Sequence, residues 1–276
     1  GGDLLCQAAC TEFALLDHLA NNASYDDETG RRLFSAVAEA ARICGWVHFD
    51  NGLHAAAQKY FVTGLRASAT AGDPVSGAYI LAQMAHQTYT IGDPQNAVGL
   101  KRTALDWAGG RATPKVRADL HAGAARAYAK TPYGRYACTR ELEKARIAIA
   151  AGPHDDDPPW IYWVTPSEIE TQAASVALDL GDPRRALDFF SAARTADYTD
   201  TYAKNDAIHL VSIADAHLAL GEIDAACAAA QEAYRKGKEV DSARQSAALA
   251  EFRKRLQTEH RGSRAAKEFL DLTAQA

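Results

Sequence analysis

Apolar residues along the chain recur with a helical spacing, and one pattern of small and large residues is repeated. In its clearest form, Ala57, Phe61 and Gly64 lie four and three positions apart, so they share one face of a helix. Gly45 lies seven positions before Gly52, which lies five positions before Ala57. Small residues on such a face let a neighbouring helix approach closely. A glycine between the two runs can end a helix in the left-handed conformation, so the predicted unit is a helical hairpin.

The hairpin pattern returns at regular intervals. The turn glycines of its copies are Gly52, Gly92, Gly134, Gly181 and Gly221. The copy around Gly134 is degraded, because the next signature residue, Cys138, follows after four positions instead of five. Successive turn glycines are 40, 42, 47 and 40 residues apart. Regular steps of this size are typical of a stacked helical array.

The periodicity predicts paired helices over most of the chain, between an N-terminal helix at 3–22 and two C-terminal helices. The predicted segments are 28–49 with 54–71, 75–91 with 95–108, 114–130 with 134–150, 166–180 with 183–196, 201–220 with 224–236, and then 242–257 and 263–275. No alternating pattern of the kind that marks a β-sheet competes with these helices. The sequence therefore predicts an all-α fold of about five helical hairpins plus terminal helices.

One long interruption separates the third hairpin from the fourth. Residues 152–159 read GPHDDDPP and are followed by the aromatic run WIYW at 160–163. Glycine, proline and aspartate in series are typical of a loop. The three aspartates lack the spread of oxygen ligands that a calcium loop needs, so a solvated loop is expected. We expect the aromatic run to pack this loop onto the helices as a plug, with a lid over a groove as the alternative.

Several segments carry a resemblance to known families. Residues 92–97 and 181–186 read G-D-P-x-x-A, and both look like tetratricopeptide repeats, although the step exceeds the usual length of about 34 residues. A more specific resemblance, to the C-terminal repeat domain of actinomycete (Streptomyces-type) helix-turn-helix transcriptional regulators, rests on three longer segments. They are CGWVHFDNGLHAAAQKYFVTGLRASATAGD, PPWIYWVTPSEIETQAASVALDLGDPRRAL and VDSARQSAALAEFRKRL.

The resemblance implies a single tetratricopeptide-like repeat domain over residues 1–276, coiled into a right-handed superhelix. N-terminal helices would lie at 3–50, repeat hairpins at 28–240 and capping helices at 241–276. A DNA-binding domain is absent from this chain. The implied function is a non-catalytic sensor or interaction domain that binds a small molecule or a peptide in its concave groove. The alternative is a stand-alone scaffold that binds a partner protein.

Aromatic and polar residues share the first helices of the hairpins, which in a repeat array line the concave face. The candidate binding residues are Arg42, Trp46, Phe49, Gln83, His86, Tyr89, Arg126, Gln172 and Asp215. Arg42 would bind an anionic or carboxylate group, and Trp46 and Tyr89 would form flat apolar walls. Ligand pockets and peptide grooves need this mixture of apolar walls and a few polar groups. The alternative for the aromatic side chains is packing in the core.

The chemistry-bearing residues show no catalytic or metal-binding motif. The nucleophile-elbow, zinc-protease, P-loop and dinucleotide patterns are all missing, so no enzyme activity and no cofactor are expected. An enzyme site assembled from His86, Glu168 and Asp215 is the alternative. The five cysteines include no C-x-x-C pair, which argues against a zinc ribbon or a disulfide framework. Cys6 and Cys10, one helical turn apart, are expected to face the core as thiols.

Composition narrows the class of partner. The 276 residues carry a net charge of -5, with 47% hydrophobic and 24% charged residues, which is ordinary for a globular chain. An acidic balance argues against direct binding of nucleic acid by this chain. No apolar run reaches about 18 residues, and nothing resembles a signal peptide. A cytoplasmic protein without membrane contact is therefore expected, and a homodimer is allowed.

Overall fold

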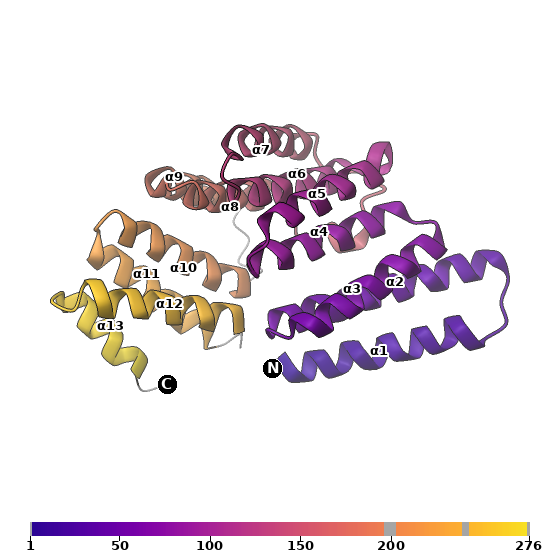
Figure 1. The fold of residues 1–276 in the computed structure, drawn as a ribbon, viewed down its shortest axis with the longest axis horizontal. Helices are drawn as coiled ribbons and strands as arrows, with labels where there is room; N and C mark the ends of the chain where they lie inside the picture. The colour runs from indigo at the N-terminus through magenta and orange to yellow at the C-terminus, as the bar shows by residue number, and fades with distance from the viewer. Residues whose placement is uncertain (1, 196–202, 239–242, 275–276) are drawn as a thin grey trace. The chain divides into compact units, whose positions relative to one another are not determined.

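The structure, a computed structural model, describes residues 2–195, 203–238 and 243–274. Among these residues 84% are helical and none lies in a strand, so the predicted all-α fold is confirmed (Figure 1). The predicted helix ends at residues 196, 201, 242 and 275 lie outside the described residues. The helices are α1 (Gly2–Asn22), α2 (Asp27–Asp50), α3 (His54–Ala71), α4 (Pro74–Thr90), α5 (Pro94–Ala108), α6 (Pro114–Ala129), α7 (Arg135–Ala150), α8 (Pro166–Asp179), α9 (Pro183–Thr195), α10 (Ala203–Ala219), α11 (Ile223–Gly237), α12 (Ala243–Glu259) and α13 (Arg264–Ala274).

The helices form two compact units, Gly1–Ile169 and Glu170–Ala276, where the sequence predicts one repeat domain. Unit 1 contains α1 to α7 and the short 3-10 turn η2 (Pro159–Ile161), and unit 2 contains α9 to α13 with most of α8. Within the described residues, no helix is both long enough and apolar enough to cross a bilayer.

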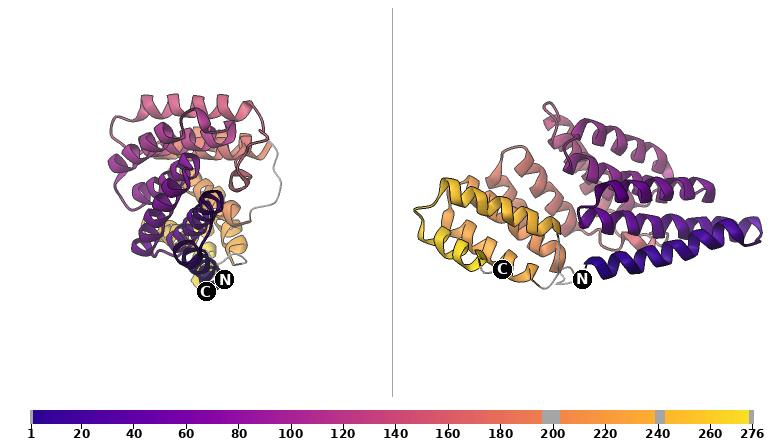
Figure 2. Two further views of the ribbon diagram at one scale, coloured as in Figure 1. Left: turned by 90° about the vertical axis from the view of Figure 1, so that its right-hand side faces the viewer. Right: turned by 60° about the horizontal axis from the view of Figure 1, so that its bottom comes forward.

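Unit 1 is built from three hairpins and one leading helix. Helix α2 pairs with α3, α4 with α5, and α6 with α7, while α1 packs against α2. Helix α4 also contacts both α2 and α6, so the first helices of the three hairpins form one layer. Figure 2 shows the hairpins of this unit side by side from two further directions.

Four of the five predicted turn glycines have the left-handed backbone that the hairpin requires. Gly52, Gly92, Gly181 and Gly221 have φ angles of 76°, 107°, 76° and 75°. Gly134 differs, because its φ of -81° is ordinary and it is the N-cap residue of α7. In this degraded copy the glycine comes one position later relative to the second helix. It therefore begins that helix instead of ending the first.

The repeated signature forms the seam between the helices. A Cβ atom at Gly45 would lie 2.5 Å from two ring carbons of Phe61, so the helices can meet there only without a side chain. At Gly64 a Cβ atom would lie 3.1 Å from Ile80 Cδ1 and 3.2 Å from the carbonyl oxygen of Ala38. The signature residues of the later copies are also buried, namely Ala97, Lys101, Ala104, Cys138, Leu142, Ala145, Ala186, Phe190, Ala193, Ala226, Ala230 and Ala233.

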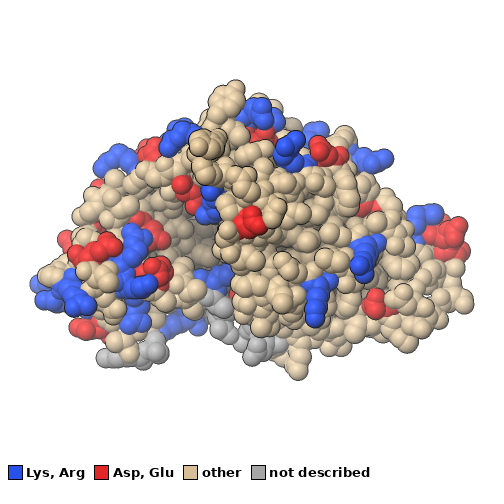
Figure 3. Space-filling view, viewed as in Figure 1, with Lys and Arg blue, Asp and Glu red and all other residues tan. Residues whose placement is uncertain are grey.

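Unit 2 ends in two helices that cover its last hairpin. Helix α12 packs against α10, and α13 packs against α11, with Phe252, Leu256 and Phe269 filling the space between them. Their outer faces carry both signs of charge, as in the ion pair of Arg264 with Glu268, where Nε and Oε1 are 2.7 Å apart. Figure 3 shows acidic and basic side chains interspersed over these helices. The two helices thus present a polar surface at the end of the unit, as capping helices should.

Candidate ligand-binding face

Trp46 of α2 and His86 of α4 meet on the layer formed by the first helices of unit 1. Their ring centres are 5.6 Å apart, with an edge-to-face angle of 71°. The His86 ring also lies 5.6 Å from the Phe49 ring, and its Nδ1 shares a 2.8 Å hydrogen bond with the hydroxyl of Tyr89. Four candidate residues from two different hairpins therefore form one aromatic cluster.

The four aromatic side chains differ in solvent exposure. Phe49 is 1% exposed and packs in the same core cluster as Phe61, and Tyr89 is 6% exposed. Trp46 and His86 are half-buried, so part of each side chain is exposed to solvent. Phe49 therefore supports the cluster from the core, and its contact with a ligand stays a prediction.

The third hairpin adds positive charge to this cluster. The guanidinium carbon of Arg126 lies 5.7 Å from the centre of the Tyr89 ring, and Nζ of Lys130 lies 5.9 Å from it. Cations are attracted to the face of an aromatic ring, so α6 is linked to α4 by this contact. The inner-face cluster, as we call it, comprises Trp46, His86, Tyr89 and Arg126, with Gln83 on the same helix as His86 and Tyr89.

Gln83 supplies a buried acceptor in the inner-face cluster. It is 8% exposed, and its Oε1 has no hydrogen-bond partner among the residues that the structure describes. A buried acceptor that lacks a donor costs about 1–3 kcal/mol. A ligand with an N–H or O–H group that reached Oε1 would remove this cost.

The guanidinium of Arg42 is paired with a carboxylate of the same helix. Its Nε and Nη2 donate to the two carboxylate oxygens of Glu39 at 2.7 and 2.5 Å. Its guanidinium carbon lies 5.2 Å from the centre of the Tyr79 ring. The bidentate face is thus filled by a carboxylate three residues earlier on the same helix. Arg42 therefore supports Tyr79, and its contact with an anionic group stays a prediction.

The aromatic run after the long interruption packs onto the same layer of helices. The Trp160 ring stacks on Tyr79 at 4.2 Å and 11°, and Trp163 Nε1 donates to the Tyr79 hydroxyl at 3.2 Å. Ile161 and Val164 are fully buried in a cluster with residues of α4 and α6. The run therefore fixes the loop onto α4, as the plug interpretation predicts.

Sequence reasoning missed a buried cation in unit 1 and the carboxylate that acts on it. Lys101 occupies the seam position that Phe61 and Phe190 fill in other copies, and it is 5% exposed. Its ammonium group lies against Gly123 of α6, where any side chain would clash with Nζ. Burial lowers the pKa of Lys101 to about 8, and Asp119 on α6 opposes this effect. Burial also raises the pKa of Asp119, and Lys101 opposes it.

Between pH 8 and pH 10 the unmodified chain is expected to gain stability relative to Lys101→Met. In this window the folded chain has released the Lys101 proton at a pKa of about 8, while the unfolded chain keeps it up to 10.5. Stability rises with pH wherever the unfolded state binds more protons. The expected gain is about 2 kcal/mol, measured by urea unfolding of both proteins across the window. A difference that does not change with pH would contradict the burial of this ammonium group.

The remaining candidates, Gln172 and Asp215, belong to unit 2. Asp215 Oδ1 accepts a 2.7 Å hydrogen bond from Nη1 of Arg255, which ties α10 to α12. Burial raises the pKa of Asp215, and the Arg255 charge opposes this rise. Asp215 therefore holds the capping helix in place. Gln172 is half-buried on α8, and the inner-face cluster is made of unit 1 residues alone.

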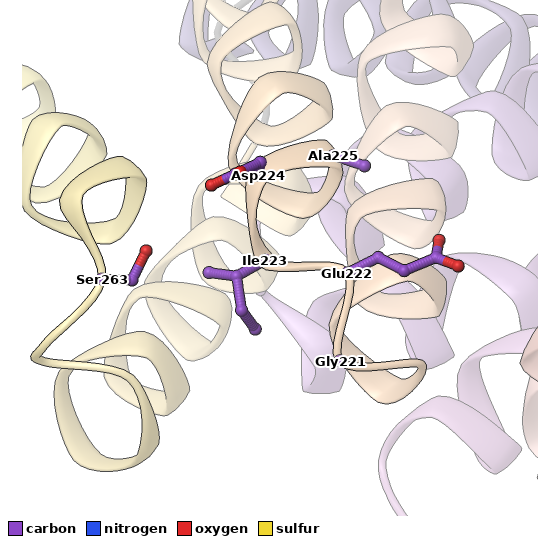
Figure 4. A pocket seen from close by; sticks show the side chains of 6 residues that line it. All are labelled: Gly221, Glu222, Ile223, Asp224, Ala225 and Ser263. Atoms are coloured by element: carbon purple, nitrogen blue, oxygen red, sulfur yellow. The ribbon is translucent and has the colours of Figure 1, made fainter.

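A shallow depression of about 580 Å³ in unit 2 opens beside the turn between α10 and α11 (Figure 4). Its lining residues are Gly221, Glu222, Ile223, Asp224, Ala225 and Ser263. The side chain of Glu222 points away from Ser263. Its Oε2 lies 2.7 Å from His217 Nδ1, within hydrogen-bond distance. Polar groups do not converge there, and no candidate residue lines it. Within the described part of the chain, no three His, Cys, Asp or Glu side chains are placed to hold a metal ion.

Comparison with known proteins identifies the architecture. No family model matches the chain, and no curated protein matches it. Among solved structures, the crystal structure of BtubC (BKLC) from P. vanneervenii is similar, with a TM-score of 0.57 and 12% sequence identity. The match covers 87% of this chain and 92% of that chain. At such low identity the likeness shows a shared helical fold and says nothing about function.

Proposed function

We propose that the chain is a non-catalytic sensor or interaction domain of tetratricopeptide type that binds a peptide segment or a small molecule at the inner-face cluster. The observation that carries this proposal is the contact of Trp46 with His86 across two hairpins, beside the Arg126–Tyr89 pair. The resemblance of three long segments to actinomycete regulators supports a place in a transcriptional regulator. DNA binding would then belong to a separate domain, which agrees with the net charge of -5 of this chain.

The cluster favours a ligand with three chemical features. Trp46 offers a flat apolar wall with a polar tip, which suits an aromatic or aliphatic group. Gln83 Oε1 on the same helix as His86 is a buried acceptor, so a donor would bind it only after the side chain turned toward the ligand. Arg126 of α6 and Lys130, the residue that follows this helix, favour a carboxylate. A short peptide segment with an apolar side chain, a backbone N–H and an acidic group combines all three.

Substitution of Trp46 or His86 by alanine is expected to weaken ligand binding by about 1–3 kcal/mol, the usual cost of truncating a buried contact. A ligand can be obtained by selecting from a random peptide library on the immobilised chain, and by native mass spectrometry of the purified protein for a retained small molecule. Titration calorimetry then gives the dissociation constants of the unmodified chain and its variants.

Trp107→Ala is the matched control for Trp46→Ala. Trp107 is 44% exposed on α5, the second helix of its hairpin, so its loss should leave the affinity unchanged. Circular dichroism of each variant checks that helical content is kept. Unchanged affinity in both Trp46→Ala and His86→Ala would move the binding site away from this cluster.

A further inference from the structure

One face of α1 exposes a row of leucine side chains. Helix α1 packs against α2 (Figure 1), and its buried face includes Ala9 and Ala20. On the opposite face Leu4, Leu15 and Leu19 are 72%, 59% and 39% exposed. These leucines are eleven and four positions apart, which is close to whole helical turns, so they form one row along the helix.

This leucine row is large and carries no positive charge. With Leu5, which is 54% exposed beside it, the row presents about 400 Å² of apolar surface, the size of patch that marks interaction sites on soluble proteins. Helix α1 contains no lysine or arginine. The capping helices α12 and α13 of unit 2 differ, because their outer faces carry both signs of charge. A partner that covers the leucine row therefore has to supply apolar side chains.

The exposed residues of α1 are spaced symmetrically about the middle of the helix. Leu4 and Leu19 are equally far from a midpoint between positions 11 and 12, and so are Ala8 and Leu15. Two antiparallel copies of α1, related by a two-fold axis at this midpoint, would place each Leu4 opposite Leu19 of the second copy. Each large Leu15 would lie opposite a small Ala8. A parallel pair would instead place Ala8 opposite Ala8 and leave a gap.

We propose that α1 is a dimerisation helix, whose leucine row packs antiparallel against the same row of a second copy of the chain. Two-fold dimers use one self-complementary patch on both copies, which is what the symmetric spacing provides. Burial of both leucine rows and their flanking residues covers about 1,200 Å² in total, the lower limit for specific interfaces. The dimer is therefore weak, and it forms at chain concentrations of about 100 µM.

The antiparallel arrangement brings two carboxylates together. Glu12 is exposed and lies beside the midpoint of α1, so the Glu12 side chains of the two copies meet on the same side of the two-fold axis. Like charges at close range repel, and salt screens the repulsion. In a parallel pair the two carboxylates would lie on opposite sides of the seam. Relief of this repulsion is therefore a signature of the antiparallel dimer.

Sedimentation equilibrium of the full chain, from about 5 to 500 µM, tests the proposal. The unmodified chain is expected to change from monomer to dimer in this range. Leu15→Ser should weaken the dimer by at least about 100-fold, because each dimer loses two buried leucine contacts. Helical content should be kept, since Leu15 is exposed in the single chain. Ile147→Ser, at a 66% exposed position of α7, is the matched control and should leave the dissociation constant unchanged.

Glu12→Gln tests the arrangement of the two helices. It should tighten the dimer by about threefold to tenfold at low ionic strength, and by less at high salt. A chain that stays monomeric throughout the concentration range would overturn the proposal and leave the leucine row to a different protein. A dimer that Leu15→Ser leaves intact would overturn the assigned surface. A dimer that Glu12→Gln does not tighten would overturn the antiparallel arrangement.

Discussion

Replacement of Asp119 by alanine is expected to lower the free energy of unfolding by about 2–4 kcal/mol. The change leaves the Lys101 ammonium group buried against Gly123 without the carboxylate that opposes the fall of its pKa. Removal of one partner from a buried pair is costly because the other charge stays uncompensated. Urea unfolding at neutral pH measures the loss.

Two further variants make this prediction specific. The double variant Lys101→Met/Asp119→Leu should regain most of the lost stability, because apolar side chains of similar size replace both charges. Asp106→Ala, at an exposed position of α5, should change stability by less than about 0.5 kcal/mol. If Asp119→Ala lowers the free energy of unfolding no more than Asp106→Ala does, Asp119 does not stabilise the buried Lys101 as described.

Gly45→Ala is expected to destabilise the chain by about 2 kcal/mol. A glycine-to-alanine change inside a helix normally stabilises by about 0.5–1 kcal/mol, because alanine has the higher helix propensity. At Gly45 the new Cβ atom would lie 2.5 Å from two ring carbons of Phe61, so α2 and α3 must separate or the ring must move. Thermal and urea unfolding report the sign of the change directly.

Gly99→Ala is the matched control for Gly45→Ala. Gly99 also lies inside a helix, α5, but no atom lies within 4 Å of a Cβ atom placed there. This variant should gain about 0.5–1 kcal/mol of stability. Effects of the same sign at the two glycines would contradict the close approach of α2 to α3.

Most of the fold is predictable from the sequence because its signals are local and periodic. The spacing of Ala57, Phe61 and Gly64 determines which face of α3 is buried, and left-handed glycines such as Gly52 mark the turns. Gly134 departs from this rule because its copy of the pattern is one residue shorter. The division into two units could not be predicted, since its boundary lies inside α8, after the long interruption, where the sequence has no break in its helical pattern.

The candidate site was predictable only in part. The repeat spacing placed Trp46 and His86 on equivalent helices, and the structure brings their rings together. The pairing of Arg42 with Glu39 and the burial of Phe49 depend on side-chain rotamers and on packing depth, which spacing does not encode. Lys101 at an apolar seam position was the available signal for a buried acidic partner.

Cys6 and Cys10 show the same limit. The one-turn spacing of Cys6 and Cys10 predicts that both face one side of α1, and the structure confirms that they pack in the same cluster. How closely each approaches Cys44 depends on the register between α1 and α2. That register is set by many apolar contacts and not by any local motif.

Side-chain footprinting with hydroxyl radicals, in the presence and absence of a ligand selected on the chain, tests the proposed binding face most directly. The ligand is expected to protect Trp46 and His86 from oxidation. Exposed aromatic residues on the second helices, Trp107 and Tyr136, should react as before. Protection of Trp107 or Tyr136 with unchanged labelling of Trp46 and His86 would contradict the proposed binding face.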